Sequence, residues 1–207
     1  MRYEAQIKDI YIENAIHLIA EGGFEKATTK NLTHCSGSVE DFKMNEAYIY
    51  RIFGSKESLY AEAFNRLDLE LYNAFKRGTE KVGGFEENTN EKLKFIFERA
   101  WEFILSEPER SKCYIRYCYS IYFEGDSQKK HNELFTFIVE EMKPIFVDEA
   151  DVKAILHSVF ILMFDFAIRV LNGDLVDDEI NRLHIFRVLY CMMAPYFKVP
   201  VNANCLT

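Results

Sequence analysis

Two short stretches near the N-terminus hold side chains suited to contacting nucleic acid. The first is Thr28-Thr29-Lys30, and the second runs from Asn45 to Lys56. The amide of Asn45 and the carboxylate of Glu46 are groups that read base edges in the major groove, and methyl or ring groups can touch thymine. Hydroxyl and cationic groups contact phosphates and so fix the position of a protein on the duplex. The candidate DNA contacts are Thr28, Thr29, Lys30, Asn45, Glu46, Ala47, Tyr48, Tyr50, Arg51 and Lys56.

Each of these assignments has a structural alternative. Thr28 can simply cap its helix, and Tyr50 can pack against the first helix. Arg51 can be a solvated surface residue. Glu46 only accepts hydrogen bonds, so among the bases it suits cytosine, and it repels phosphates.

The elements that must position these side chains are helices. Apolar residues repeat at the i, i+3, i+4, i+7 spacing from Ile12 to Ile19, which predicts an amphipathic helix. Glycines and capping residues delimit the next segments: a stop at Gly22-Gly23, a short helix between Thr28 and Ser36, a third over about 45–53 and a longer one over about 56–77. Three short helices followed by a long one describe a helix-turn-helix domain.

The sequence GGFEKATTKNL, followed by NEAYIYRIFGSKESLYAEAF, resembles the N-terminal domain of the TetR family of transcriptional regulators. The matching residues are Gly23, Phe24, Thr28, Leu32, Gly37, Tyr50, Phe53, Lys56 and Leu59. The resemblance covers about the first 65 residues. It implies a helix-turn-helix over about 28–53, whose last helix enters the major groove while Tyr50 and Lys56 bind phosphates.

The chain departs from that family pattern between Gly37 and the third helix. Six additional residues, 38–43, lengthen the turn, and Glu40 and Asp41 bring negative charge close to where a phosphate would lie. Either this insertion alters DNA docking, or it loops out while Val39 and Phe42 pack against the core.

The remaining sequence predicts a second helical domain over residues 66–207, after a DNA-binding domain over 1–65. Five helices are expected near 91–106, 109–124, 127–146, 151–172 and 177–197. Glycine and proline are scarce, at 9 and 4 residues, which disfavours a protein built from strands and turns. The predicted fold class is therefore all-α, with the long helix joining the two domains.

The last two predicted helices are rich in large apolar residues. In TetR-like proteins these helices pair with their symmetry mates in a four-helix bundle, so the resemblance implies a homodimer that binds a near-palindromic operator. The alternative is that they fill the core of the monomer. The candidate interface residues are Phe160, Met163, Ile185, Leu189 and Met192.

The resemblance also implies a cavity in the second domain that binds a small-molecule effector. An apolar cavity with a few polar groups suits an amphipathic or aromatic ligand. Asp165 either faces this pocket or pairs with Arg169, four residues later on the same helix. The candidate pocket residues are Trp101, Tyr114, Tyr117, Phe164 and Asp165.

Bulk properties bound the possible functions. The net charge is −8, and residues 1–60 hold seven Lys or Arg against nine Asp or Glu, so DNA affinity must come from a few placed cations. The most apolar stretch, 154–171, is interrupted by His157, Asp165 and Arg169, which favours a buried helix over a membrane span. Scattered cysteines and histidines match no metal, redox or catalytic motif.

These observations predict a cytoplasmic, ligand-responsive DNA-binding regulator whose partners are operator DNA, an effector and a second copy of the chain. They predict no enzyme activity, no cofactor, no metal and no membrane association, and the family resemblance favours a repressor. The competing hypothesis is a dimeric small-molecule-binding or protein-interaction module that has lost DNA binding, which the acidic balance and the insertion would permit.

Overall fold

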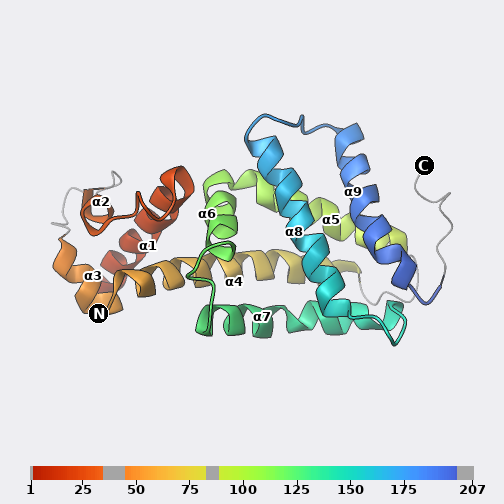
Figure 1. The fold of residues 1–207 in the computed structure, drawn as a ribbon, viewed down its shortest axis with the longest axis horizontal. Coiled ribbons are helices and arrows are strands. Elements are labelled where there is room, and N and C mark those ends of the chain that lie inside the picture. The colour runs from red at the N-terminus through yellow and green to blue at the C-terminus, as the bar shows by residue number, and fades with distance from the viewer. Residues whose placement is uncertain (1, 35–44, 83–88, 200–207) are drawn as a thin grey trace. The chain divides into compact units, whose positions relative to one another are not determined.

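The computed structural model describes residues 2–34, 45–82 and 89–199, and every regular element within these ranges is a helix (Figure 1). The predicted all-α class is confirmed. The insertion at 38–43 lies outside the described residues. The α-helices are α1 (Arg2–Gly22), α2 (Thr29–His34), α3 (Glu46–Phe53), α4 (Lys56–Val82), α5 (Thr89–Ser106), α6 (Pro108–Cys118), α7 (Asp126–Met142), α8 (Val152–Leu171) and α9 (Glu179–Met193).

Contacts divide the chain into two units. Unit 1 consists of Met1–Glu70 and Glu107–Asn132, and unit 2 of Leu71–Ser106 and Glu133–Thr207. Helices α4 and α7 therefore contribute to both units. The predicted domain boundary at residue 65 stays a prediction, but contacts place α6 with the N-terminal helices, whereas the sequence assigned it to the second domain.

The core of unit 1 follows the predicted helical spacing. Ile12, Ala15, Ile16 and Ile19 of α1 are all buried. Each buried aliphatic side chain of the size of isoleucine contributes about 1.5–3 kcal/mol. Figure 1 shows α1, α2 and α3 gathered around the start of α4. The other helices contribute buried apolar side chains to the same core, among them Leu32, Ile49, Leu59 and Phe64.

A polar seam joins α6 to α1. The Arg116 guanidinium donates to the Ile19 carbonyl at 2.6 Å. That carbonyl lies in the last turns of α1, where the helix dipole favours a cation and where α1 has no basic residue of its own. Arg110 donates to the Glu13 carboxylate at 2.9 Å. These contacts explain why α6 belongs to unit 1.

A buried polar cluster connects α4, α6 and α7 within unit 1. The Tyr114 hydroxyl donates to Asp68 Oδ1 at 3.0 Å, and His131 Nδ1 lies 2.9 Å from the same oxygen. The Asp68 residue is only 3% exposed. Buried polar groups need such partners, because an unsatisfied one costs about 1–3 kcal/mol.

The core of unit 2 is built from α5, α8 and α9. Trp101 is fully buried, with the ring of Phe97 stacked on it at 5.7 Å between centroids. Its indole N–H donates to Asp177 Oδ1 at 3.0 Å, and Arg182 donates to the same carboxylate. The segment between α8 and α9 is thereby fixed to α5.

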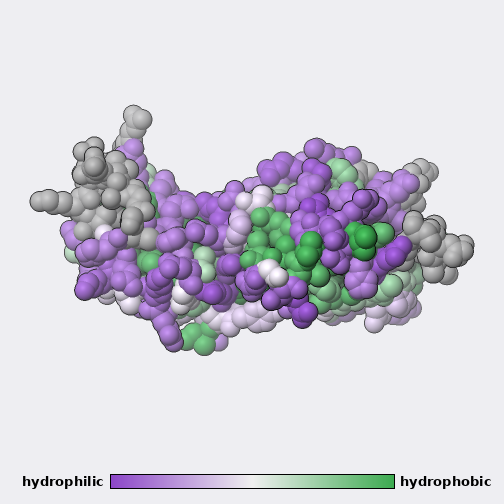
Figure 2. Space-filling model, turned by 90° about the horizontal axis from the view of Figure 1, so that it is seen from above, coloured by the Kyte–Doolittle hydropathy of each residue, from purple (hydrophilic) through white to green (hydrophobic). Residues whose placement is uncertain are grey.

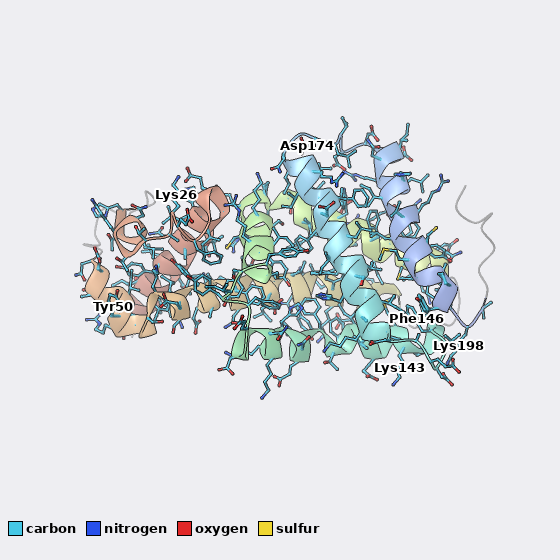
Figure 3. The ribbon with its side chains drawn as sticks, in the orientation of Figure 1. Lys26, Tyr50, Lys143, Phe146, Asp174 and Lys198 are labelled. Atoms are coloured by element: carbon cyan, nitrogen blue, oxygen red, sulfur yellow. The ribbon has the colours of Figure 1, made fainter. Side chains whose placement is uncertain are left out.

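Three predicted helices end earlier than the sequence periodicity indicated. Helix α7 ends at Met142 and α9 at Met193, and short 3-10 turns containing Pro144 and Pro195 follow them. Proline lacks an amide hydrogen and disfavours the helical conformation of the residue before it. The two turns pair, since Lys198 N–H donates to the Ile145 carbonyl at 2.9 Å (Figure 3).

The third early end is that of α6, which stops at Cys118 rather than near 124. The Ser120 hydroxyl bonds the Tyr117 carbonyl at 2.8 Å and accepts from the Tyr122 amide at 3.1 Å. Serine side chains compete with the helical hydrogen bonds in this way, so the chain turns here.

Helix α8 is long and apolar enough to cross a membrane by length and composition. In unit 2 it instead packs beside α5 and α9. The prediction of a buried helix is right for one face only, because only 17% of the most apolar 18 residues of α8 are buried within the chain. Figure 2 shows apolar surface, in green, gathered in the part of the picture that holds α8 and α9.

Candidate nucleic-acid interface

Helix α2 is capped at its start and bonded to α1 near its end. The Thr28 hydroxyl accepts from the Asn31 amide at 3.2 Å, which caps the start of the helix. The buried Asn14 side chain of α1 donates to the Leu32 carbonyl at 2.9 Å. The position of α2 is thus set by α1.

Helix α3 is anchored at its first turn and along its inner face. The Asn45 side-chain oxygen accepts from the Tyr48 amide at 3.3 Å, and the Asn45 carbonyl accepts from the Tyr11 hydroxyl at 2.7 Å. Burial raises the pKa of Tyr11 to about 12, so this phenol keeps its proton. Ile49 is completely buried. Gly54 ends the helix with a φ of 79°, a conformation that favours glycine.

The opposite face of α3 is open to solvent. Glu46, Ala47 and Arg51 are exposed. Tyr50, which is labelled in Figure 3, is 55% exposed. The Arg51 guanidinium lies 4.4 Å from the centroid of the Tyr48 ring, a cation–π contact that restricts the arginine. This face carries one cation, one carboxylate and two phenols within six residues.

The start of α4 contributes a further cation beside α3. The Ser55 hydroxyl caps α4 by accepting from the Ser58 amide at 3.0 Å. The Lys56 ammonium lies 5.7 Å from the centroid of the Tyr60 ring. A lysine at the first turn of a helix, next to free amide groups, is a common position for a phosphate contact.

A hydrogen bond connects the first turns of α2 and α3. The Thr29 hydroxyl donates to Glu46 Oε2 at 2.7 Å. The single hydroxyl hydrogen of Thr29 is therefore used within the protein and is not available to a phosphate.

The predicted DNA contacts fall into three groups. Lys30, Glu46, Ala47, Tyr50 and Arg51 are exposed on unit 1. Thr28 and Asn45 are exposed as well but cap helices, as the structural alternative for Thr28 proposed. Thr29, Tyr48 and Lys56 are half-buried. Their roles toward DNA remain predictions. Sequence reasoning missed the Tyr11 and Thr29 bonds because they join positions 34 and 17 residues apart.

The predicted pocket residues are divided between the two units. Trp101 and Phe164 are buried in unit 2, whereas Tyr114 and Tyr117 are buried in unit 1. Asp165 is exposed and accepts from Arg169 Nε at 3.0 Å, as the ion-pair alternative predicted. An effector site remains a prediction. Within the described residues no cluster of His, Cys, Asp or Glu is arranged to hold a metal.

The predicted dimer residues differ in how deeply they are buried within the chain. Met163, Ile185 and Leu189 are buried within the chain, which is the alternative that the sequence left open. Met192 and Phe160 are half-buried.

No protein-family model and no curated protein matches the sequence, but solved structures match nearly the whole chain. A TetR family transcription regulator from Marinobacter aquaeolei is similar to it with a TM-score of 0.74 at 14% identity, over 93% of this chain and 98% of that one. A second such regulator, from a Shewanella species, gives 0.73 at 13% identity, over 93% of this chain and 99% of that one. A TetR-like transcriptional regulator from a Rhodococcus species gives 0.63 at 16% identity, over 90% of this chain and 92% of that one. The chain has the fold of these proteins.

Proposed function

We propose that this chain is a DNA-binding transcriptional regulator of the TetR family, which binds a near-palindromic operator as a homodimer. It acts as a cytoplasmic repressor whose operator affinity changes when a small molecule binds. The TetR-like fold and the residues quoted from the first 65 positions support this proposal.

The observation that carries the proposal is the two-sided construction of α3. Its inner face is buried at Ile49 and its first turn is bonded to Tyr11, while Tyr50 and Arg51 remain exposed. A recognition helix needs this combination, because it must be held rigidly while its outer face enters the major groove.

The acidic balance of the chain does not prevent binding if the cations lie at the contact. Lys30, Arg51 and Lys56 give three cations per subunit at the first turns of α2 and α4 and on α3. A dimer would then neutralise six phosphates. The logarithm of its binding constant should therefore fall by about 5 for each tenfold rise in salt concentration.

The homodimer is supported by the outer side of α8 and α9. Ile161 and Leu162, which precede the buried Met163 and Phe164 on α8, are only half-buried, and Ile180 of α9 is 80% exposed. Helix α8 combines high hydropathy with little burial, so it needs a further apolar cover. A second copy of the same surface would supply it with two-fold symmetry.

A salt series of binding to the DNA upstream of the protein's own gene, with random DNA in parallel, tests this function. Specific binding that weakens steeply with salt is expected. The double variant Tyr50→Ala, Lys56→Ala should abolish it, whereas the matched variant Tyr196→Ala, Lys198→Ala in unit 2 should not. Equal affinity for upstream and random DNA at low salt would instead favour the ligand-binding or protein-interaction module.

A further inference from the structure

We propose that Glu46 is a base-reading residue that selects cytosine at one position of each operator half-site, and that Thr29 is its positioning residue. This inference rests on the proposed function and names the base that its recognition helix selects. It begins from the 2.7 Å bond between the Thr29 hydroxyl and Glu46 Oε2.

That bond restricts a side chain which would otherwise be free at the surface. Glu46 is exposed and is the first residue of α3, whereas Thr29 is the first residue of α2. Holding Oε2 fixes the plane of the carboxylate and leaves Oε1 for another donor. A reading group that is already oriented loses less conformational entropy on binding than a mobile one.

The neighbouring Asn45 is less suited to read a base. Its side-chain oxygen caps α3 by accepting from the Tyr48 amide, and its carbonyl accepts from Tyr11. Turning the amide toward a base edge would break the cap, at a cost of about tenfold in the stability of the helix start. Glu46 therefore presents the first polar group of α3 that can reach DNA without breaking this cap.

The chemistry of a carboxylate then selects the base. In the major groove guanine presents the acceptors N7 and O6, and thymine presents O4, and all of these repel an acceptor. Adenine offers one donor at N6, but its acceptor N7 lies beside it. Cytosine offers the N4 donor without an acceptor of its own at that edge, so it is the base that Glu46 favours.

Thr29 holds the Glu46 carboxylate in place and does not itself contact DNA in this proposal. Its hydroxyl hydrogen is donated to Glu46, so the hydroxyl cannot also donate to a phosphate. Removing the hydroxyl should leave Glu46 mobile and weaken the preference for cytosine without changing which base is preferred.

The test is selection of bound sequences from a randomised DNA pool by the full chain and its variants, each first checked for a normal thermal melt. The wild type should enrich a two-fold symmetric motif with cytosine at one position of each half-site. Replacing that cytosine by thymine should weaken binding about tenfold per half-site. Glu46→Gln should shift this position toward adenine, because an amide pairs with adenine N6 and N7.

Three further variants separate the possible roles. Glu46→Ala should lose the preference at this position alone, and Thr29→Val should keep cytosine with a several-fold weaker preference. Glu57→Gln makes the same change of charge at the exposed first turn of α4 and should give the wild-type motif.

The outcomes distinguish this inference from the function on which it rests. A wild type that enriches no motif would overturn both. A motif that is enriched equally by wild type and Glu46→Gln would overturn the inference alone. An unchanged cytosine preference in Thr29→Val would remove the positioning role.

Discussion

The buried cluster of Asp68, Tyr114 and His131 allows a quantitative prediction for Tyr114→Phe. The substitution removes one hydroxyl, which donates to Asp68 at 3.0 Å, and keeps the ring that stacks on Phe64 at 5.2 Å between centroids. A buried hydrogen bond of this kind contributes about 1–3 kcal/mol to the free energy of unfolding. For a chain of this length that corresponds to a fall of about 2–12 °C in the melting temperature.

The assay is urea and thermal unfolding followed by circular dichroism of the helices. Tyr119→Phe is the matched control, because Tyr119 is 67% exposed. The free energy of unfolding of this control should stay within about 0.5 kcal/mol of wild type. Asp68→Ala should cost more than Tyr114→Phe, since it removes the acceptor of two side chains. A Tyr114→Phe protein as stable as the Tyr119→Phe control would refute the reasoning.

Three other predictions concern different parts of the chain. Burial raises the pKa of Cys113 and of Cys118 to about 12, so the folded state keeps both protons where an unfolded chain loses them. The free energy of unfolding should therefore fall above pH ~9, by up to about 1.4 kcal/mol per pH unit for each thiol, and Cys113→Ala should reduce that slope in urea titrations between about pH 7.5 and 10.5. Arg116→Met removes the donor to the last turns of α1 and should destabilise the protein by roughly 1 kcal/mol in the same assay; an unchanged midpoint would contradict this. Leu162→Glu should convert the proposed dimer to a monomer in sedimentation at micromolar concentration, whereas Leu69→Glu on α4 should not; equal behaviour of the two variants would count against the α8 and α9 surface.

The helices near the N-terminus were predictable because their signals are local. The apolar spacing from Ile12 to Ile19 and the caps at Asn45 and Ser55 act over a few residues. The ends of α7 and α9 were also encoded locally, by Pro144 and Pro195, but the predicted helices wrongly ran through both because apolar periodicity continued beyond them.

The contacts that shape the candidate site were beyond sequence reasoning. Thr29 and Glu46 are 17 residues apart, and Asp68 and His131 are 63 apart. Such pairs depend on which helix faces are turned toward each other, and a single sequence carries no signal for that.

The composition of unit 1 from two separate stretches of chain has a consequence for protein engineering. An N-terminal segment cut out at residue 65 and fused to another protein would lack α6, and with it Arg110 and Arg116. The Glu13 carboxylate would then lose both of its arginine donors, Arg66 and Arg110, and the Ile19 carbonyl would keep only the amide of Gly23. For the proposed regulator, exchange of DNA specificity should therefore succeed more often when α6 is moved together with the N-terminal helices, or when only the exposed residues of α3 are replaced.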